Sequence, residues 1–262
     1  MRIVVLTKPV PDPASGGERL GPDARLVRTA TPAVINGNDE YALEAALKLT
    51  EALGGEVTLL SMAPAGGPET LRKGLAMGAH RAVHVQDTAL EGSCTRSTAR
   101  VLAAALRTLE FDLALAGADT SDGQGGVVGP AVAALLGLPY LSYAARIEPD
   151  PDAGLVRVRR LSPVGYDVLE APMPALIACT QVLGEPRYPS LKGIMAARSK
   201  ELLTRSLADL ELDGAAVGGA ASANRLVESH PPAARPPTQV VRGPADDAAR
   251  AIVGFLESRR VI

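Results

Sequence analysis

The residues best suited to hold a ligand lie in a glycine-rich loop at 117–130. Thr120, Ser121 and Gln124 offer side-chain hydrogen bonds there, between glycines that let the backbone approach an anion closely. The glycine spacing matches neither the dinucleotide-binding fingerprint nor the Walker A motif, which also requires Gly-Lys-Ser/Thr. On spacing alone, the segment is either a nucleotide-binding loop or a plain tight turn with Asp122 as a capping or turn residue.

The three histidines and two cysteines do not assemble into a catalytic or metal-binding set. His80 and His84 lie in a strand-like run, where an interval of four does not place two ligands as it does on a helix. Cys94 and Cys179 form no metal-type spacing, and His230 lies in a proline-rich tail. We therefore expect no metal site and no catalytic residues.

A third segment, 185–200, has residues suited to binding a partner protein. It is bounded by prolines, carries Leu191, and leads into a basic stretch that holds Arg198 and Lys200. An apolar side chain beside cations is typical of a docking surface rather than of a reaction centre. The alternative is a loop leucine that folds back onto the core.

The elements that must position these segments alternate between strand and helix. Strands are expected at 2–7, 56–62, 82–85 and 113–117, and helices at 39–53, 68–77, 95–109 and 127–136. This alternation predicts a doubly wound, mainly parallel α/β sheet of Rossmann-like, adenine-nucleotide-binding type. Ligands of such sheets bind outside the carboxyl ends of strands, and the glycine-rich loop follows the strand at 113–117.

The pattern changes after residue 142. Strand-like runs at 144–147, 155–161 and 166–170 indicate an antiparallel excursion, and the apolar run at 175–180 returns to the main sheet. We therefore divide the chain into an α/β nucleotide-binding domain, 1–204, which includes the docking loop 185–200, and a C-terminal arm, 205–262. The arm is rich in Gly, Ala and Pro before a helix at 245–258 and has too little apolar content to fold alone, so we expect it to pack on a partner subunit.

Composition excludes several classes of function. The 27 basic residues nearly balance the 29 acidic ones, and a chain with no Trp and two Phe offers few surfaces for stacking bases, so no nucleic acid is expected. The first apolar run is too short for a signal peptide. The uncharged stretch 123–145 is interrupted by Gly and Pro, which argues against a membrane span. A cytoplasmic protein, not embedded in a membrane, is expected.

Three stretches carry a resemblance to a known family: 35–44 (INGNDEYALE), 71–85 (LRKGLAMGAHRAVHV) and 185–200 (EPRYPSLKGIMAARSK). With them the chain resembles the β (small) subunit of an electron-transfer flavoprotein, collinearly from residue 1 to about residue 200 and more weakly to the end. The resemblance implies an electron carrier that forms a heterodimer with an α subunit, scaffolds the FAD of that subunit and catalyses no bond chemistry itself.

The resemblance also implies an adenine nucleotide in this chain, AMP in ordinary members and a second FAD in electron-bifurcating ones. The contacts carried over are Leu6, Asn36, Asn38, Asp39, Met62, Gly117, Asp119, Thr120, Ser121, Asp122, Gly123, Gln124, Gly125, Gly126, Val127 and Val128. The plainer interpretations are a helix N-cap for Asp39 and core filler for Met62. AMP is favoured because the loop has no aromatic residue, and Tyr41, inside the first helix, is expected to turn away.

For the segment 185–200 the resemblance implies an exposed leucine that anchors acyl-CoA dehydrogenases or other flavin dehydrogenases. The docking residues expected are Tyr188, Pro189, Leu191, Ile194 and Met195. Two positions depart from the family: Leu161 replaces a frequent glutamate, and Asn38 replaces an aromatic that often abuts the flavin. Two rivals stay open, a bifurcating-type β subunit with a second FAD and a free-standing ATP-binding α/β protein.

Overall fold

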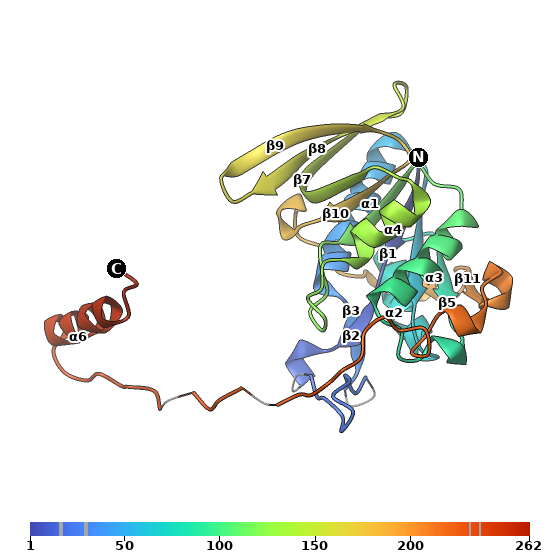
Figure 1. The fold of residues 1–262 in the computed structure, drawn as a ribbon. Helices are drawn as coiled ribbons and strands as arrows, with labels where there is room; N and C mark the ends of the chain where they lie inside the picture. Colours follow the sequence, from blue (N-terminus) through green and yellow to red (C-terminus); the bar gives the residue numbers. More distant parts are fainter. Residues whose placement is uncertain (16–17, 29–30, 231, 236) are drawn as a thin grey trace. The chain divides into compact units, whose positions relative to one another are not determined.

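A nine-stranded sheet forms the centre of the first part of the chain in a computed structural model of the protein (Figure 1). The structure describes residues 1–15, 18–28, 31–230, 232–235 and 237–262. These residues form two compact units, Met1–Arg225 and Leu226–Ile262, and each is described by itself. In the part of the chain described, no helix is long and apolar enough to cross a bilayer.

The sheet is mostly parallel, with an antiparallel hairpin layer at one edge. Its strands are β1 (Arg2–Leu6), β4 (Glu56–Met62), β5 (Arg81–Val85), β6 (Leu113–Gly117), β7 (Tyr140–Asp150), β8 (Leu155–Ser162), β9 (Gly165–Pro172), β10 (Ala175–Cys179) and β11 (Leu202–Arg205). Their order is β11-β5-β4-β1-β6-β10-β7-β8-β9. Within this sheet, the β7–β8 and β8–β9 pairs are antiparallel. Because β10 lies between β6 and β7, the expected return of the chain to the main sheet is confirmed.

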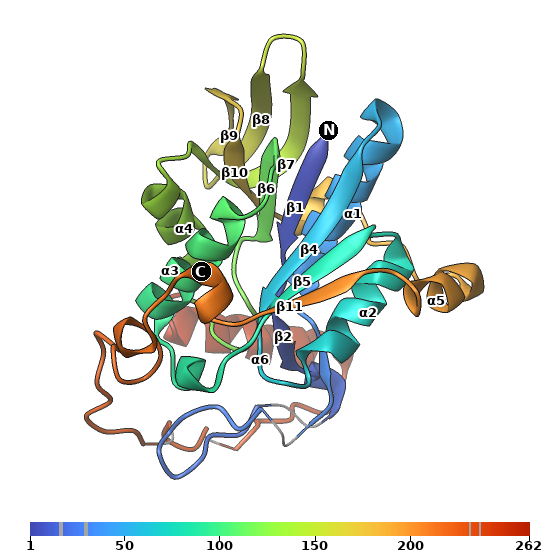
Figure 2. The ribbon, with the colours of Figure 1, turned by 90° about the vertical axis from the view of Figure 1, so that its right-hand side faces the viewer.

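Helices cover both faces of this sheet, as the doubly wound prediction requires. On one face lie α1 (Gly37–Leu53), α2 (Gly67–Met77) and α5 (Leu191–Ala197), and on the other lie α3 (Thr95–Arg107) and α4 (Val128–Leu136) (Figure 2). Short 3-10 turns connect these elements: η1 (Pro13–Ser15), η2 (Thr88–Leu90), η3 (Gln181–Leu183), η4 (Ala208–Leu210) and η5 (Gly214–Ala216). The mixed α/β fold class is confirmed.

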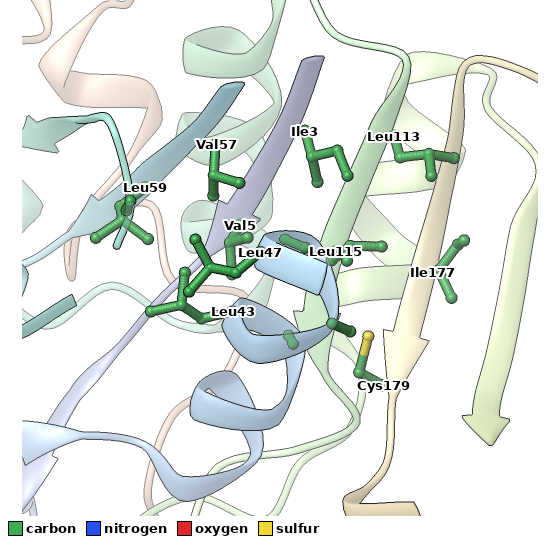
Figure 3. Close-up of a cluster of buried hydrophobic side chains, with 14 of the residues drawn as sticks. Ile3, Val5, Leu43, Leu47, Val57, Leu59, Leu113, Leu115, Ile177 and Cys179 are labelled. Carbon is green, nitrogen blue, oxygen red and sulfur yellow. The ribbon is translucent and has the colours of Figure 1, made fainter. Parts of the chain in front are cut away.

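The central strands have continuous apolar sequences because both of their faces are buried. In β1, Ile3 and Val5 belong to the core under α1 and α2, whereas Val4 and Leu6 belong to the core under α3 and α4. Figure 3 shows Leu43 of α1 close to Val5 in the first core. Each fully buried aliphatic side chain stabilises the fold by about 1.5–3 kcal/mol, so this double layer holds the strand ends in fixed positions.

Some elements were missing from the sequence prediction. The segment 185–200, expected as a loop, contains the helix α5, whose N-cap Ser190 accepts a hydrogen bond at Oγ from Gly193 N at 3.0 Å. The edge strand β11 and the hairpin of β2 (Pro9–Pro11) and β3 (Ala33–Ile35) were also missed. Elements of three to seven residues are too short for a readable periodicity.

The first unit extends past residue 204, where the sequence placed the boundary. Arg100 of α3 donates from NH1 to Ala216 O at 3.0 Å, and Ser97 donates from Oγ to Gly218 O at 3.4 Å. The segment 205–225 therefore packs on the α/β unit, and the separate arm begins at Leu226. That arm contains α6 (Ala245–Ser258), in which no residue is buried.

Candidate functional site

The carboxyl ends of β4, β1 and β6 are neighbours in the sheet, which brings together segments far apart in sequence. Met62, Leu6 and Gly117 are the last residues of these strands. Leu6 and Met62 pack in the core under α3 and α4, together with Val128 at the start of α4. Leu6, Met62 and Val128 therefore contribute to the core under α3 and α4.

Asp39 joins two of these strand ends. It lies in the first turn of α1, whose N-cap is Asn36, so the N-cap interpretation of Asp39 is wrong. Its Oδ2 accepts a hydrogen bond from Lys8 N at 2.8 Å, and its Oδ1 accepts one from Gly117 N at 3.1 Å. Burial raises the pKa of Asp39 to about 7, although these donors and the charge of Lys8 oppose that shift.

Gly117 permits this arrangement because it has no side chain. A Cβ at this position would lie 2.5 Å from Asp39 Oδ1 and 2.7 Å from Asn38 Cβ. Both distances are shorter than van der Waals contact, so any other residue would push β6 away from α1. The close approach explains why a strand-ending glycine stands at this point.

The two asparagines of the α1 turn hold the glycine-rich loop. Asn36 donates from Nδ2 to Asp119 O at 2.9 Å and accepts at Oδ1 from Ser121 N at 3.1 Å. Asn38 donates from Nδ2 to Asp119 Oδ1 at 2.6 Å. Asn38 therefore has a structural partner in this loop.

Asp122 has a role that the sequence did not indicate. Its side chain is 1% exposed, and its two oxygens bind Lys8 Nζ at 2.7 Å and Arg28 NH1 at 2.9 Å. Burial opposes ionisation, but the hydrogen bond and charge of Lys8 outweigh it and hold the pKa of Asp122 below its usual value. The turn at 120–124 is closed by Thr120 O, which accepts hydrogen bonds from Gly123 N and Gln124 N. The carboxylate thus ties the end of β1 and the segment around Arg28 to the loop.

A hollow of about 230 Å³ opens between α1 and the loop. Its lining consists of Asn36, Gly37, Asn38, Tyr41, Asp119, Ser121 and Gln124. Ser121 Oγ is buried without a hydrogen-bond partner in the part of the chain described, and Gln124 adopts a φ of 46°, which is rare outside glycine. An unsatisfied hydroxyl and a strained backbone in one hollow are typical of a ligand site.

Tyr41 is a wall of this hollow, so the expectation that it turns away is wrong. Gly125, Gly126 and Val127, by contrast, are exposed at the tip of the loop and do not line the hollow. Thr120 and Gly123 lie on the Lys8 side, where Thr120 Oγ1 is 3.3 Å from Lys8 Nζ. The predicted residues therefore divide between the hollow, the loop tip and the buried strand ends.

The segment 185–200 is fixed at its beginning by an ion-pair network with α1. Arg187 binds Glu44 through Nε at 2.8 Å and Glu51 through NH1 at 2.5 Å. The Glu44 side chain is 5% exposed; burial opposes its ionisation, but the bonds from Arg187 outweigh burial and lower its pKa.

The other end of the segment is fixed by reciprocal contacts with α2. Arg72 of α2 donates from NH1 to Ala197 O at 2.5 Å, at the end of α5. Lys200 donates from Nζ to Leu75 O at 2.9 Å and to Ala79 O at 2.6 Å, at the end of α2. A Cβ on Gly193 would lie 2.2 Å from Ala76 O, so the two helices touch at this glycine.

Between these fixed ends the apolar side chains face outward. The exposed fractions are 94% for Tyr188, 75% for Leu191, 66% for Met195 and 46% for Ile194. The interpretation of Leu191 as a loop leucine folded onto the core does not fit this exposure. Leu161 pairs with Tyr166 on the hairpin formed by β8 and β9.

A sheet with polar loops gathered at its carboxyl edge is the architecture of nucleotide-binding α/β proteins. The family model for the electron transfer flavoprotein domain matches residues 23–210. The chain is 35% identical to the electron transfer flavoprotein subunit beta of Thermoanaerobacterium thermosaccharolyticum over 100% of both chains. It is 36% identical to the subunit of that name in Mycobacterium tuberculosis over 99% of both.

A further relative is subunit CarD of the caffeyl-CoA reductase-Etf complex of Acetobacterium woodii, 33% identical over 100% of both chains. This chain belongs to the electron transfer flavoprotein β-subunit family. The resemblance stated from the three sequence stretches is thereby confirmed.

Proposed function

We propose that this chain, as the β subunit of a heterodimeric electron-transfer flavoprotein, scaffolds the FAD of an α subunit, holds AMP, and docks flavin dehydrogenases such as acyl-CoA dehydrogenases. The observation that carries the proposal is the segment 185–200, which is fixed at both ends and presents Leu191 to solvent. Family membership supports the electron-transfer role and argues against the alternative of a free-standing ATP-binding protein.

The C-terminal arm supports the need for an α subunit. Within α6, Ile252, Val253 and Phe255 are 55%, 46% and 49% exposed, and the helix buries no residue of its own unit. An amphipathic helix gains most of its stability from tertiary packing of its apolar face. We infer that this face packs on the α subunit in the heterodimer.

The AMP assignment rests on the chemistry of the hollow beside α1. The amides of Asn38 and Gln124 and the hydroxyl of Ser121 fit the hydrogen-bonding groups of a nucleoside. The exposed backbone before α4 offers N–H groups at a helix N-terminus, where a phosphate is favoured. The volume of about 230 Å³ lies below the about 300–1,000 Å³ of drug-sized sites, which favours the smaller nucleotide.

The prediction for this site is one AMP and one FAD per purified heterodimer. Acid denaturation of the complex releases bound nucleotides, and chromatography with absorbance detection counts both. The alternative of a second FAD has specific support in Tyr41, which offers an aromatic ring in the wall of the hollow. Two flavins without AMP would replace the AMP assignment with the bifurcating type.

The docking proposal predicts that Leu191→Ala weakens binding of the dehydrogenase about 10- to 100-fold. Burial of a leucine contributes about 1.5–3 kcal/mol, and about 1.4 kcal/mol is tenfold in affinity. The measurement is the rate at which a reduced acyl-CoA dehydrogenase reduces the heterodimer, as a function of its concentration.

The matched control is Leu135→Ala, because Leu135 is 44% exposed on α4, on the opposite face of the sheet. The control is expected to leave the rate unchanged, and the heterodimer melting temperature is expected to stay the same for Leu191→Ala. An unchanged rate for Leu191→Ala would remove Leu191 as the anchor.

A further inference from the structure

A groove lies beside the exposed leucine, between α2 and α5, and Figure 2 shows α5 next to one end of α2. It has a volume of about 530 Å³ and lies within the first unit. Its walls are Arg72, Lys73, Ala76, Pro189, Ile194, Ala197 and Arg198. Neither the nucleotide nor Leu191 itself occupies this space in the proposed function.

The charge of the groove is positive and only partly compensated. Lys73 is paired with Glu40 at 2.5 Å, whereas among the described residues Arg72 donates to backbone carbonyls and to no carboxylate. Arg198 is exposed and has no carboxylate within ion-pairing distance among the described residues. From Arg187 to Lys200 the sequence contains no acidic residue.

Helix ends offset part of this charge. The carbonyls that accept from Arg72 and Lys200 carry the partial negative charge of a helix C-terminus, equivalent to roughly half an elementary charge. Arg198, which is exposed, keeps its field toward solvent. A partner with carboxylates would be attracted to the groove, and one with exposed cations would be repelled.

The floor of the groove selects for apolar groups as well. Ile194, Pro189 and Ala76 lie among the cations, and Leu191 and Met195 are exposed on the same helix. A free anion would satisfy the charges but would leave these carbon atoms in water. The surface therefore fits a polypeptide with an aliphatic side chain next to carboxylates.

We propose that the groove between α2 and α5 receives an acidic segment of the docked dehydrogenase, with its aliphatic side chain on Ile194 and its carboxylates on Arg198 and Arg72. The inference rests on the proposed docking function and extends it. In this complex Leu191 packs into the dehydrogenase, and a segment of the dehydrogenase packs into the groove. Contact in both directions fixes the orientation of the complex, which a single leucine cannot do.

The test is Arg198→Glu, with Arg96→Glu as the matched control. Arg96 is exposed on α3, so both variants change the net charge equally on different faces. The measurement is the second-order rate constant for reduction of the heterodimer by a reduced acyl-CoA dehydrogenase, at ionic strengths from about 0.01 M to about 0.3 M. The Debye length is about 30 Å at the lower value and below about 10 Å at the higher one, so salt screens steering between exposed charges.

We expect Arg198→Glu to lower the rate constant about tenfold at low salt and to flatten its dependence on salt, because steering acts on association. Arg96→Glu is expected to change neither. Equal effects of both variants would reduce the result to net charge and overturn the proposal. A loss of heterodimer assembly in Arg198→Glu would also overturn it, because the groove would then hold the α subunit or an arm.

The outcomes separate this proposal from the docking function itself. Leu191→Ala is expected to lower the rate constant at every salt concentration without changing its slope. If Leu191→Ala acts and Arg198→Glu does not, the groove proposal fails alone. If neither acts, the docking function fails with it.

Discussion

Arg187→Met is expected to destabilise the protein by about 3 kcal/mol, because it leaves the carboxylate of Glu44 buried without its main partner. Removal of one member of a buried ion pair costs about 3–5 kcal/mol. The lower value applies here because Lys48 Nζ remains 3.5 Å from Glu44 Oε1. Methionine keeps much of the apolar volume of the arginine, so the loss is mainly electrostatic.

The measurement is the free energy of unfolding of the heterodimer by chemical denaturation, at one fixed protein concentration. The matched variant is Glu44→Gln/Arg187→Met, in which no unpaired charge is left. We expect the double variant to recover a large part of the stability. A loss in the double variant as large as in Arg187→Met would show that the packing of the segment, rather than the buried charge, is responsible.

Asp39→Ala is expected to cost at least about 2 kcal/mol and to lower the nucleotide content of the heterodimer. Lys8 N and Gly117 N would both lose their acceptor, and a buried donor without a partner costs about 1–3 kcal/mol. The ends of β1 and β6 would then separate at the base of the glycine-rich loop. Asp39→Asn, which keeps one acceptor oxygen, is expected to have a smaller effect in the same two measurements.

The same residue predicts a dependence of stability on pH. Since burial raises the pKa of Asp39 from 3.8 to about 7, the native state holds a proton that the unfolded chain has released in this range. The stabilisation of the folded state by this bound proton is complete below about pH 4. It is lost as the pH rises through about 7, at up to about 1.4 kcal/mol per pH unit.

We expect the difference in unfolding free energy between the wild type and Asp39→Asn to decrease from about pH 5 to about pH 8. The comparison with Asp39→Asn removes the titration of all other groups. A difference that does not change with pH would mean that the two N–H donors keep the carboxylate ionised throughout.

The parallel core was predictable from the sequence because its strands are continuous apolar runs with a helix between them. The α5 helix was not, because it has seven residues and its position depends on the contact of Gly193 with Ala76 O. Ser190, three residues before the glycine whose N–H it accepts, was the local signal that could have indicated it.

The site was predictable only in part, for a similar reason. The glycine-rich loop follows a predicted strand and could be placed at the carboxyl edge of the sheet, whereas the turn before α1 was placed beside it by the family resemblance. Lys8 and Arg28 were missed because their shared partner, Asp122, lies 114 and 94 residues away in sequence. Pairings at that separation have no local periodicity, although the position of Lys8 just after β1 placed it near the carboxyl edge.

The fixation of the segment 185–200 at both ends has a consequence for the docking of a dehydrogenase that we propose. A loop that had to become ordered on contact would lose conformational entropy with each encounter, and each immobilised side chain would cost about 0.5–1.5 kcal/mol. Because Arg187 and Lys200 already hold the backbone in place, a small contact area suffices for recognition. In the proposed docking function, a small contact area permits rapid dissociation, so we expect release of the dehydrogenase not to limit turnover.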